Sequence, residues 1–316
     1  MRQKILIVDH VHPSLIDKLT ARKFLCTVDM GMTYDRFMET GDDYVGLVIR
    51  SRFPVDAALL NSKENLRFII RIGSGMENID TVYAEKRNII CLGTPEGNAP
   101  SVAEHCLGML ISALRHIHIA NGEVKNGKWD RVKNKGTELS ERTVGIIGYG
   151  HTGPAFARLL EPFGCEIYAY DKYRAGIGDR YVKEVPLQVI LQKCDVISLH
   201  INYLTDNHYF FDYPLIRQIK HPCILINTSR GMVVNTIDLL KGLEEGKIEY
   251  ACLDVLEDED LQLNLIPKEQ WPEYLQKLAE RSDVLLTPHI AGQTLTAEKR
   301  HADIAYKKIV KELSNF

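Results

Sequence analysis

The stretch TVGIIGYGHTGPAFARLLEPFGCEIYAYD (143–171) decides the fold of this chain. It opens with the apolar run VGII, which is too short for a helix and ends at glycine, a pattern typical of a buried strand. Gly148, Gly150 and Gly153 follow with the spacing G-x-G-x-x-G, and an amphipathic segment and a second apolar run then end at Asp171. Strand, glycine turn, helix, strand and acid together predict the βαβ unit that binds a dinucleotide.

Each glycine of this loop has its own physical reason. Gly148 lets the chain turn tightly, Gly150 lets the backbone approach a pyrophosphate, and Gly153 lets the helix pack closely on the strand. The free N–H groups and the positive dipole end at the start of the helix attract phosphate. We therefore predict a cofactor-binding loop that also includes His151 and Thr152. The alternative is that the glycines serve only a tight turn.

The acid at the end of the second strand predicts which dinucleotide is bound. Asp171 follows the last glycine at close to the usual spacing of about 20 residues, where a carboxylate accepts hydrogen bonds from the ribose hydroxyls. The same charge repels a 2′-phosphate, so the sequence favours NAD over NADP. Lys172 and Arg174 follow directly and weaken this preference.

Length, charge and cysteine usage limit the class of protein. The 316 residues suggest about two domains, and the apolar content of 45% is ordinary for a soluble globular protein. The net charge of −3 gives no reason to expect nucleic acid or a membrane surface as a partner. No apolar run is long enough to span a membrane, and no secretory pattern is present. The seven scattered cysteines form no C-x-x-C, so we expect free thiols, a reducing cytoplasm and no metal site.

Strands alternate with helices on both sides of the glycine loop, which predicts an α/β protein with parallel sheets. We expect two doubly wound domains. A Rossmann NAD-binding domain (98–292) is inserted into a flavodoxin-like substrate-binding domain (1–97 and 293–316). One long helix (99–119) leads into the inserted domain, and the last helix (294–313) returns to the first. Ligands of such sheets bind at the carboxyl ends of the strands, so we expect the site where the two domains face each other.

Three charged residues follow strands in the second half of the chain. Arg230 follows the run ILINTS, Glu259 comes after ACLDV, and His289 closes LLTPH. A histidine can accept the hydroxyl proton when a hydride leaves a 2-hydroxy acid, and a glutamate beside it favours the imidazolium form. An arginine can hold the substrate carboxylate through two parallel hydrogen bonds. The alternatives are a surface salt bridge, a solvated acidic loop and a packed histidine.

The chain resembles the D-isomer-specific 2-hydroxyacid dehydrogenase family from about residue 66 to 294. The matching stretches, in the order of the family, are RIGSGMENID (71–80), NAPSVAEHCLGMLISALR (98–115), the glycine-loop stretch (143–171), DVISLHI (195–201), LINTSRGMVVN (225–235), ACLDVLEDE (251–259) and LLTPHIAGQT (285–294).

This resemblance implies roles for individual residues. Arg230, Glu259 and His289 match the catalytic residues of the family. The resemblance also implies that the backbone of Ser74, Gly75 and Met76 binds the substrate carboxylate, that Ser229 and Asp254 lie near the nicotinamide, and that His200 and Asn202 lie near the adenosine. The family forms dimers through the long helix and the arm after it, which suits Trp129 in the polar segment 122–136.

Departures from the family pattern concern the cofactor contacts and one insertion. Asn202 stands where the family usually has proline, and Asp260 stands where proline usually follows the catalytic acid. The segment 260–283 is longer than the common form, so we expect an insertion that reshapes the site.

Three arginines suggest a phosphorylated substrate. Arg50, Arg52 and Arg71 end neighbouring strands of the first domain and resemble the cluster that faces the substrate phosphate in D-3-phosphoglycerate dehydrogenase. The alternative is that these arginines pair with local carboxylates such as Asp56 or Asp80.

Several functions follow from these observations. The chain is expected to be an NAD-dependent D-2-hydroxyacid dehydrogenase, first of 3-phosphoglycerate. Glyoxylate, hydroxypyruvate and lactate-type substrates remain open. The alternative from another class is an NAD-sensing protein related to the corepressors of the family.

Overall fold

The computed structural model describes residues 3–41, 43–260 and 264–313, and the chain divides into two compact units. Unit 1 comprises Met1–Asn98 and Gln293–Phe316, and unit 2 comprises Ala99–Gly292. Unit 2 is therefore inserted into the sequence of unit 1, so two separate segments of chain build the first unit. Each unit contains its own sheet and its own buried core.

Unit 1 is a five-stranded parallel sheet in the order β2-β1-β3-β4-β5. This is the order of a flavodoxin-like doubly wound sheet, as predicted. Its strands are β1 (Lys4–Ile7), β2 (Leu25–Val28), β3 (Tyr44–Ile49), β4 (Phe68–Arg71) and β5 (Ile90–Gly93). Its helices are α1 (Pro13–Ala21), α2 (Tyr34–Glu39), α3 (Ala57–Asn61), α4 (Thr81–Lys86) and α12 (Leu295–Leu313).

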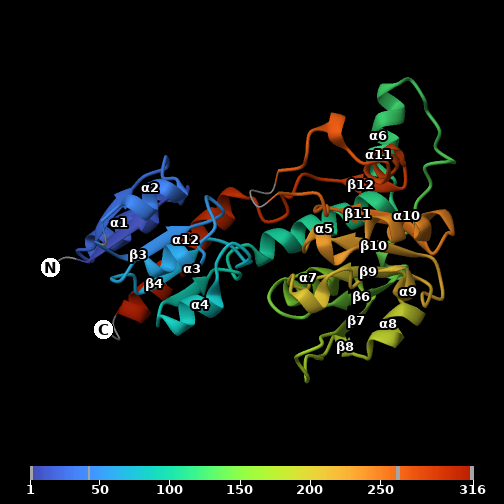
Figure 1. Ribbon diagram of the computed structural model, residues 1–316. Coiled ribbons are helices and arrows are strands. Elements are labelled where there is room, and N and C mark those ends of the chain that lie inside the picture. The colour runs from blue at the N-terminus through green and yellow to red at the C-terminus, as the bar shows by residue number, and fades with distance from the viewer. Residues whose placement is uncertain (1–2, 42, 261–263, 314–316) are drawn as a thin grey trace. The chain divides into compact units, whose positions relative to one another are not determined.

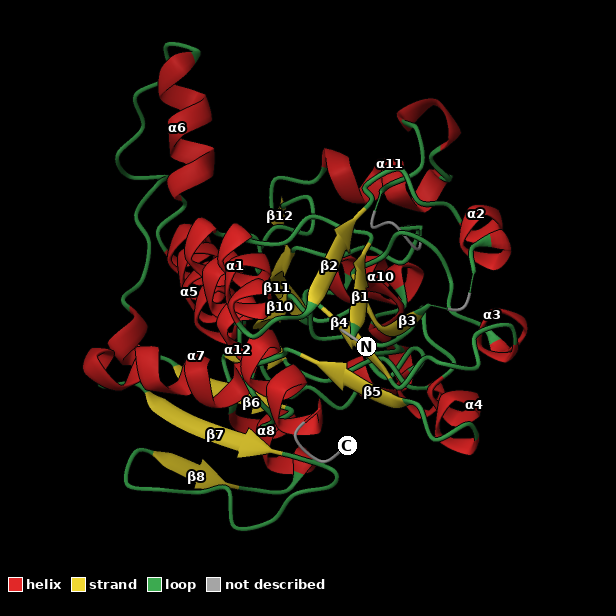
Figure 2. Ribbon diagram, turned by 90° about the vertical axis from the view of Figure 1, so that its left-hand side faces the viewer, coloured by secondary structure: helices red, strands yellow, loops and turns green. Residues whose placement is uncertain are grey.

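Alternation along the strands gives this sheet two apolar faces. Leu6 packs with the residues of α2 and α3, whereas its neighbours Ile5 and Ile7 pack with α1 and α12. Figure 2 shows α2, α3 and α4 along one side of the sheet. Because successive side chains of a strand point to opposite faces, continuous apolar strands are what a sheet covered on both faces requires.

Unit 2 is a seven-stranded parallel sheet in the order β12-β11-β10-β9-β6-β7-β8 (Figure 1). Its strands are β6 (Thr143–Ile147), β7 (Glu166–Tyr170), β8 (Val182–Glu184), β9 (Val196–Leu199), β10 (Cys223–Asn227), β11 (Ile248–Leu253) and β12 (Val284–Leu286). Its helices are α5 (Ala99–Leu114), α6 (Ile117–Lys125), α7 (Thr152–Leu160), α8 (Leu187–Lys193), α9 (Tyr213–Ile216), α10 (Thr236–Glu244) and α11 (Glu273–Glu280). The strand order changes direction beside β6, which is where a Rossmann sheet binds its dinucleotide. The predicted fold class is therefore confirmed.

One predicted helix is wrong in its length. The helix expected over 99–119 is two helices, because α5 ends at Leu114 and α6 begins at Ile117. His116 has φ of +52°, in the left-handed region that ends helices. The Leu114 carbonyl accepts a hydrogen bond from the Thr137 N–H at 3.0 Å, so the end of α5 is satisfied by a distant residue.

The predicted insertion has structure of its own. Residues 261–263 lie outside the described part of the chain, but α11 forms within the remainder and buries Leu275 and Leu278 against the core of unit 2. Trp271 packs on the same core and donates its indole N–H to the Ile266 carbonyl at 2.9 Å. This segment therefore covers one face of the sheet.

Candidate functional site

The glycine loop joins β6 to α7, and the structure gives each glycine a distinct environment. Gly148 has φ of +94°, and a Cβ there would lie 2.5 Å from the His200 carbonyl oxygen. A Cβ on Gly153 would lie 2.3 Å from the Gly148 carbonyl oxygen. A Cβ on Gly150 would meet no described atom within 4 Å. The fold thus requires two of the glycines, while the third leaves the backbone open on the side that a pyrophosphate needs.

His200 contacts this loop through its backbone and its side chain. Its Nε2 lies 2.8 Å from Ser198 Oγ, its Nδ1 lies 3.0 Å from Thr152 Oγ1, and its ring lies beside Phe156. Burial lowers the pKa of His200 to about 3, so the ring is neutral at physiological pH. The side chain fixes the first residue of α7. Its predicted contact with the cofactor stays a prediction.

The start of α7 is suited to an anion. His151 is the N-cap residue and makes no side-chain hydrogen bond to the described part of the helix. The first N–H groups of a helix have no intrahelical partner, so an uncapped helix start offers them to a ligand.

Asp171 directly follows β7 and shapes the same loop. Its carboxylate accepts the N–H groups of Tyr149 at 2.7 Å and Arg174 at 3.1 Å. The Arg174 guanidinium reaches back to the carbonyls of Tyr149 (3.3 Å) and Gly150 (3.4 Å). Lys172 forms an exposed ion pair with a carboxylate. The two cations that weaken the preference for NAD therefore already have protein partners. Together, the open glycine, the helix start and this acid fit NAD.

Arg230, Glu259 and His289 follow three neighbouring parallel strands, β10, β11 and β12. Because the strands are parallel, these residues belong to the same edge of the sheet. The Glu259 and His289 side chains are 14% and 18% exposed, and Oε2 of the former lies 2.5 Å from Nδ1 of the latter. The structure thus brings together two residues that are 30 positions apart in the sequence.

The backbone around this pair is held firmly. The other Glu259 oxygen accepts the Leu256 N–H at 2.7 Å, so the two oxygens have different partners. His289 has φ of +53°, a conformation that costs about 1–3 kcal/mol in a residue other than glycine. The Asp254 carboxylate accepts the N–H groups of Ile290 and Ala291 at 2.9 and 2.8 Å, which fixes the chain after His289.

Arg230 lies in a loop packed on the segment that follows β11. A Cβ on Gly231 would lie 1.9 Å from the Leu256 carbonyl oxygen, so these two loops touch. The Asn227 side chain accepts from Ser229 Oγ at 2.7 Å and donates to the Arg230 carbonyl at 3.0 Å. The Arg230 guanidinium is half-buried and donates to the Ser229 carbonyl at 2.8 Å.

Two residues that the sequence analysis missed, Thr94 and His301, support the predicted substrate loop of unit 1 (Ser74, Gly75 and Met76). Thr94 Oγ1 accepts the Gly73 N–H at 3.0 Å and lies 2.7 Å from Nδ1 of His301 on α12. Burial lowers the pKa of His301 to about 4, and the nearby Arg50 acts in the same direction. The Thr94 hydroxyl thus lies between the Gly73 N–H and the His301 ring, so both residues support the loop.

The three arginines of unit 1 differ in how they are engaged. The Arg71 guanidinium donates to the carbonyls of Gly75 (2.7 Å) and Arg50 (3.0 Å), so it braces the loop. Arg52 Nε lies 3.2 Å from Asp9 Oδ1. Among the described residues, the Arg50 guanidinium has no hydrogen-bonding or ion-pair partner.

Asp9 is the carboxylate that the sequence analysis missed here. It also accepts the Arg50 N–H at 2.6 Å, and it lies two residues after β1, where it carries no motif. The carboxylates named as alternatives cap helices instead, since Asp56 accepts the Leu59 N–H and Asp80 accepts the Tyr83 N–H.

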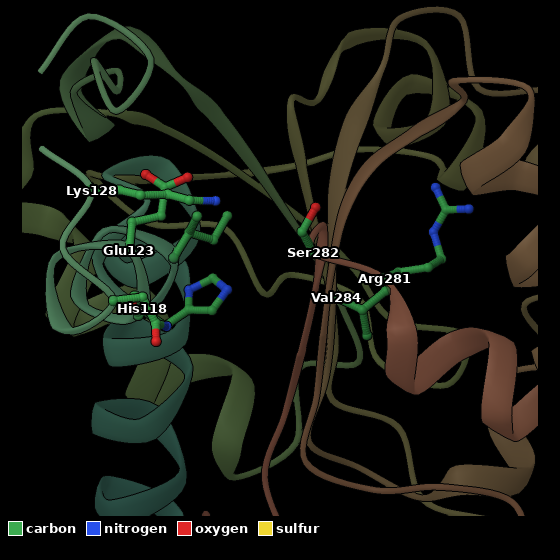
Figure 3. A pocket seen from close by; sticks show the side chains of 9 residues that line it. His118, Glu123, Lys128, Arg281, Ser282 and Val284 are labelled. Carbon is green, nitrogen blue, oxygen red and sulfur yellow. Dashed lines mark hydrogen bonds between the residues drawn. The ribbon is translucent and has the colours of Figure 1, made fainter. Parts of the chain in front are cut away.

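A cavity of about 310 Å³ lies elsewhere in unit 2. Figure 3 shows His118, Glu123 and Lys128 on one side and Arg281 and Ser282 on the other. None of the predicted site residues lines it.

The described residues show neither a metal-binding cluster nor a membrane-spanning helix. They contain no cluster of three or more histidine, cysteine or acidic side chains that could hold a metal ion. None of the described helices combines the length and the apolar character needed to cross a lipid bilayer.

Comparison with known proteins identifies relatives over the whole chain. Residues 107–291 match the family model "D-isomer specific 2-hydroxyacid dehydrogenase, NAD binding domain". A hydroxypyruvate reductase of Thermotoga maritima is 32% identical over 99% of both chains. A D-3-phosphoglycerate dehydrogenase of Archaeoglobus fulgidus is 31% identical over 97% of this chain, which spans 56% of that relative.

Solved structures show the same fold. A D-lactate dehydrogenase of Aquifex aeolicus, complexed with NAD and lactic acid, superposes with a TM-score of 0.84 at 23% identity. The match covers 99% of this chain and 96% of the other.

Proposed function

Since this chain belongs to the D-isomer specific 2-hydroxyacid dehydrogenase family, we propose that it interconverts a short D-2-hydroxy acid and its 2-oxo acid, with Arg230, Glu259 and His289 as the catalytic residues. The observation that carries this proposal is the Glu259–His289 hydrogen bond at the carboxyl edge of the Rossmann sheet. NAD, when bound, accepts or supplies the hydride.

His289 has the position and the hydrogen bonding of a proton carrier. A carboxylate only accepts, so Nδ1 of His289 carries the proton shared with Glu259, and Nε2 is left for the substrate oxygen. In the oxidation direction, Nε2 takes the hydroxyl proton and Glu259 stabilises the imidazolium that forms. In reduction, the same nitrogen returns the proton.

Arg230 is proposed to hold the substrate carboxylate and polarise the C2 carbonyl, because a guanidinium offers paired donors in a fixed geometry. In unit 1, the backbone N–H groups of residues 74–76 are proposed to bind a carboxylate of the substrate. The bracing of this loop by Arg71 and Thr94 supports that role, since a preorganised loop loses less entropy on binding.

The arginines of unit 1 bear on the substrate. We propose D-3-phosphoglycerate as the first candidate, because Arg50 and Arg52 follow the same strand and the Arg50 guanidinium lacks a described partner. Hydroxypyruvate is the second candidate. The ion pair with Asp9 reduces the charge that Arg52 can offer, and a relative matched over 99% of its length is a hydroxypyruvate reductase.

The test is an absorbance assay of NADH with a panel of D-2-hydroxy and 2-oxo acids, on the wild type and on Arg52→Ala. With 3-phosphoglycerate as substrate, KM is expected to be about 10- to 100-fold higher in the variant, because a charged hydrogen bond is worth roughly 1.5–3 kcal/mol. KM for a non-phosphorylated acid serves as the control and is expected to stay unchanged. Turnover of hydroxypyruvate alone would favour the second candidate, and no turnover with any acid would contradict the dehydrogenase proposal.

We further propose a homodimer formed through α6 and the arm that follows it. No described residue of α6 is buried, and four large apolar side chains are exposed here: Ile117 (53%), Val124 (49%), Trp129 (78%) and Val132 (86%). A concentration of exposed apolar side chains is typical of a protein interface. The seven free thiols support the proposed location in the cytoplasm.

A further inference from the structure

His105 contacts the loop of the proposed proton carrier from a different element. It lies on α5 and is half-buried, and its Nε2 is 3.0 Å from Thr287 Oγ1 and 3.5 Å from Asp254 Oδ1. Thr287 directly follows β12 and is two residues before His289.

The three side chains form a directed chain of hydrogen bonds. Thr287 Oγ1 donates to Asp254 Oδ1 at 2.6 Å, and a hydroxyl has only one proton to give. The bond between Thr287 and His105 is therefore one in which Nε2–H of His105 donates and the hydroxyl accepts. The Thr287 hydroxyl is thus held between a donor, His105, and an acceptor, Asp254.

Asp254 connects these hydrogen bonds to the backbone around His289. Its side chain is fully buried, and its carboxylate accepts the N–H groups of Ile290 and Ala291. Its backbone carbonyl accepts the His289 N–H at 2.8 Å. His289 is thereby held on both sides in a left-handed conformation that only surrounding contacts can maintain.

We propose that His105 is a positioning residue for His289. Acting through Thr287 and Asp254, it keeps the imidazole aimed at Glu259. This inference rests on the proposed function, because it assigns His289 the proton transfer. His105 itself need not touch substrate or cofactor.

The test compares His105→Ala, His105→Gln and Thr287→Val with the wild type. Loss of the His105 donor is expected to lower kcat about 10- to 100-fold, the range found when a residue that orients a functional side chain is removed. KM for NAD is expected to stay within about twofold. The glutamine side chain carries an N–H donor at a similar distance from the backbone. His105→Gln is therefore expected to retain most of the wild-type kcat. Thr287→Val breaks the same chain, so combining it with His105→Ala is expected to lower kcat no further than either change alone.

Two outcomes would overturn the proposal: an unchanged kcat in His105→Ala, or losses that multiply in the double variant. A measurement that needs no turnover distinguishes failure of the positioning role from failure of the proposed function. In nitrogen-labelled protein, the shared proton on Nδ1 of His289 is expected to give a far-downfield NMR signal in the wild type and in His105→Gln. The signal is expected to be lost in His105→Ala, and its persistence there would refute the positioning role even if no substrate were turned over. If His105→Ala fails to fold, Thr287→Val carries the same comparison.

Discussion

At the scale of single residues, the Glu259 carboxylate has two distinct tasks. One oxygen holds its own loop through the Leu256 N–H, and the other holds the His289 imidazole. A hydrogen bond to a charged acceptor is about twice as strong as a neutral one, so the ring has one favoured orientation. The side chain that we propose as the proton carrier is therefore aligned before any substrate arrives.

Replacing the imidazole is expected to affect turnover and leave cofactor binding intact. In His289→Ala, kcat is expected to fall about 10²- to 10⁴-fold, the usual contribution of a general acid or base. The Kd for NADH, followed by fluorescence titration, is expected to stay within about twofold, because the glycine loop is unaltered. Glu259→Gln serves as the matched comparison, since it keeps an acceptor but removes the charge, and its loss of kcat is expected to be smaller. Parallel losses of kcat and of NADH affinity in His289→Ala would contradict proton transfer.

The residues that sequence analysis identified and those that it missed differ in a physical way. Arg230, Glu259 and His289 follow apolar strand-like runs, so their common edge could be predicted from local patterns. Asp9 and His301 act through partners 41 or more positions away, and nothing in their immediate sequence marks them. Burial and long-range hydrogen bonds gave these residues their roles, and only the fold supplies both.

At the scale of elements, the strands and the last helix (294–313) could be predicted from the sequence, and the break between α5 and α6 could not. Strands of parallel sheets are continuous apolar runs, and these are visible in the sequence. The break between α5 and α6 falls in the run LRHIH, which contains neither glycine nor proline. The Leu114 carbonyl at the end of α5 is satisfied by the Thr137 N–H, a partner that lies outside the local sequence.

One buried neutral histidine supports an element in each unit, which makes stability depend on pH. Burial lowers the pKa of His200 to about 3 and that of His301 to about 4, from an ordinary 6.5. The unfolded chain therefore binds more protons than the folded chain below about pH 6.5, and stability falls as pH falls through that window. Each histidine contributes a slope of up to about 1.4 kcal/mol per pH unit.

Urea unfolding at pH 7.0, 5.5 and 4.5 measures this effect. The midpoint is expected to fall with pH in the wild type, and to fall less steeply in His301→Gln, because a glutamine takes up no proton on unfolding. The exposed His10 provides a matched control, and His10→Gln is expected to leave the slope unchanged. Equal slopes in all three proteins would show that His301 does not contribute to the acid sensitivity.

At the scale of the whole molecule, two parallel-sheet units with separate cores share one chain. The sequence predicted alternating strands and helices, but alternation alone does not distinguish the order 2-1-3-4-5 of unit 1 from other doubly wound orders. The flavodoxin-like order therefore goes beyond what the alternation itself contains. In physical terms, it depends on which apolar faces meet across the whole unit.

The arm is expected to determine the oligomeric state. Val132→Asp places a charge on a side chain that is 86% exposed, so the fold of the protomer is expected to tolerate it. If the arm docks on a second copy, this variant is expected to shift a dimer to a monomer in light scattering coupled to size exclusion. Ile237→Asp on α10 is the control, because that side chain is 59% exposed and lies outside the arm. A wild type that is monomeric at micromolar concentration would contradict the interface.

The return of the chain from unit 2 to complete unit 1 has a consequence for synthesis on the ribosome. The face of the first sheet that holds Ile5 and Ile7 is covered in part by Ala302, Ala305 and Ile309 of α12. About 200 residues are translated between β5 and this helix, which takes roughly 10 to 40 s at 5–20 residues per second. During that interval the apolar face of the nascent first sheet lacks the cover that α12 provides, and every described strand of unit 2 is translated before that helix. The part made first is therefore the part finished last, and it is the natural client for a chaperone.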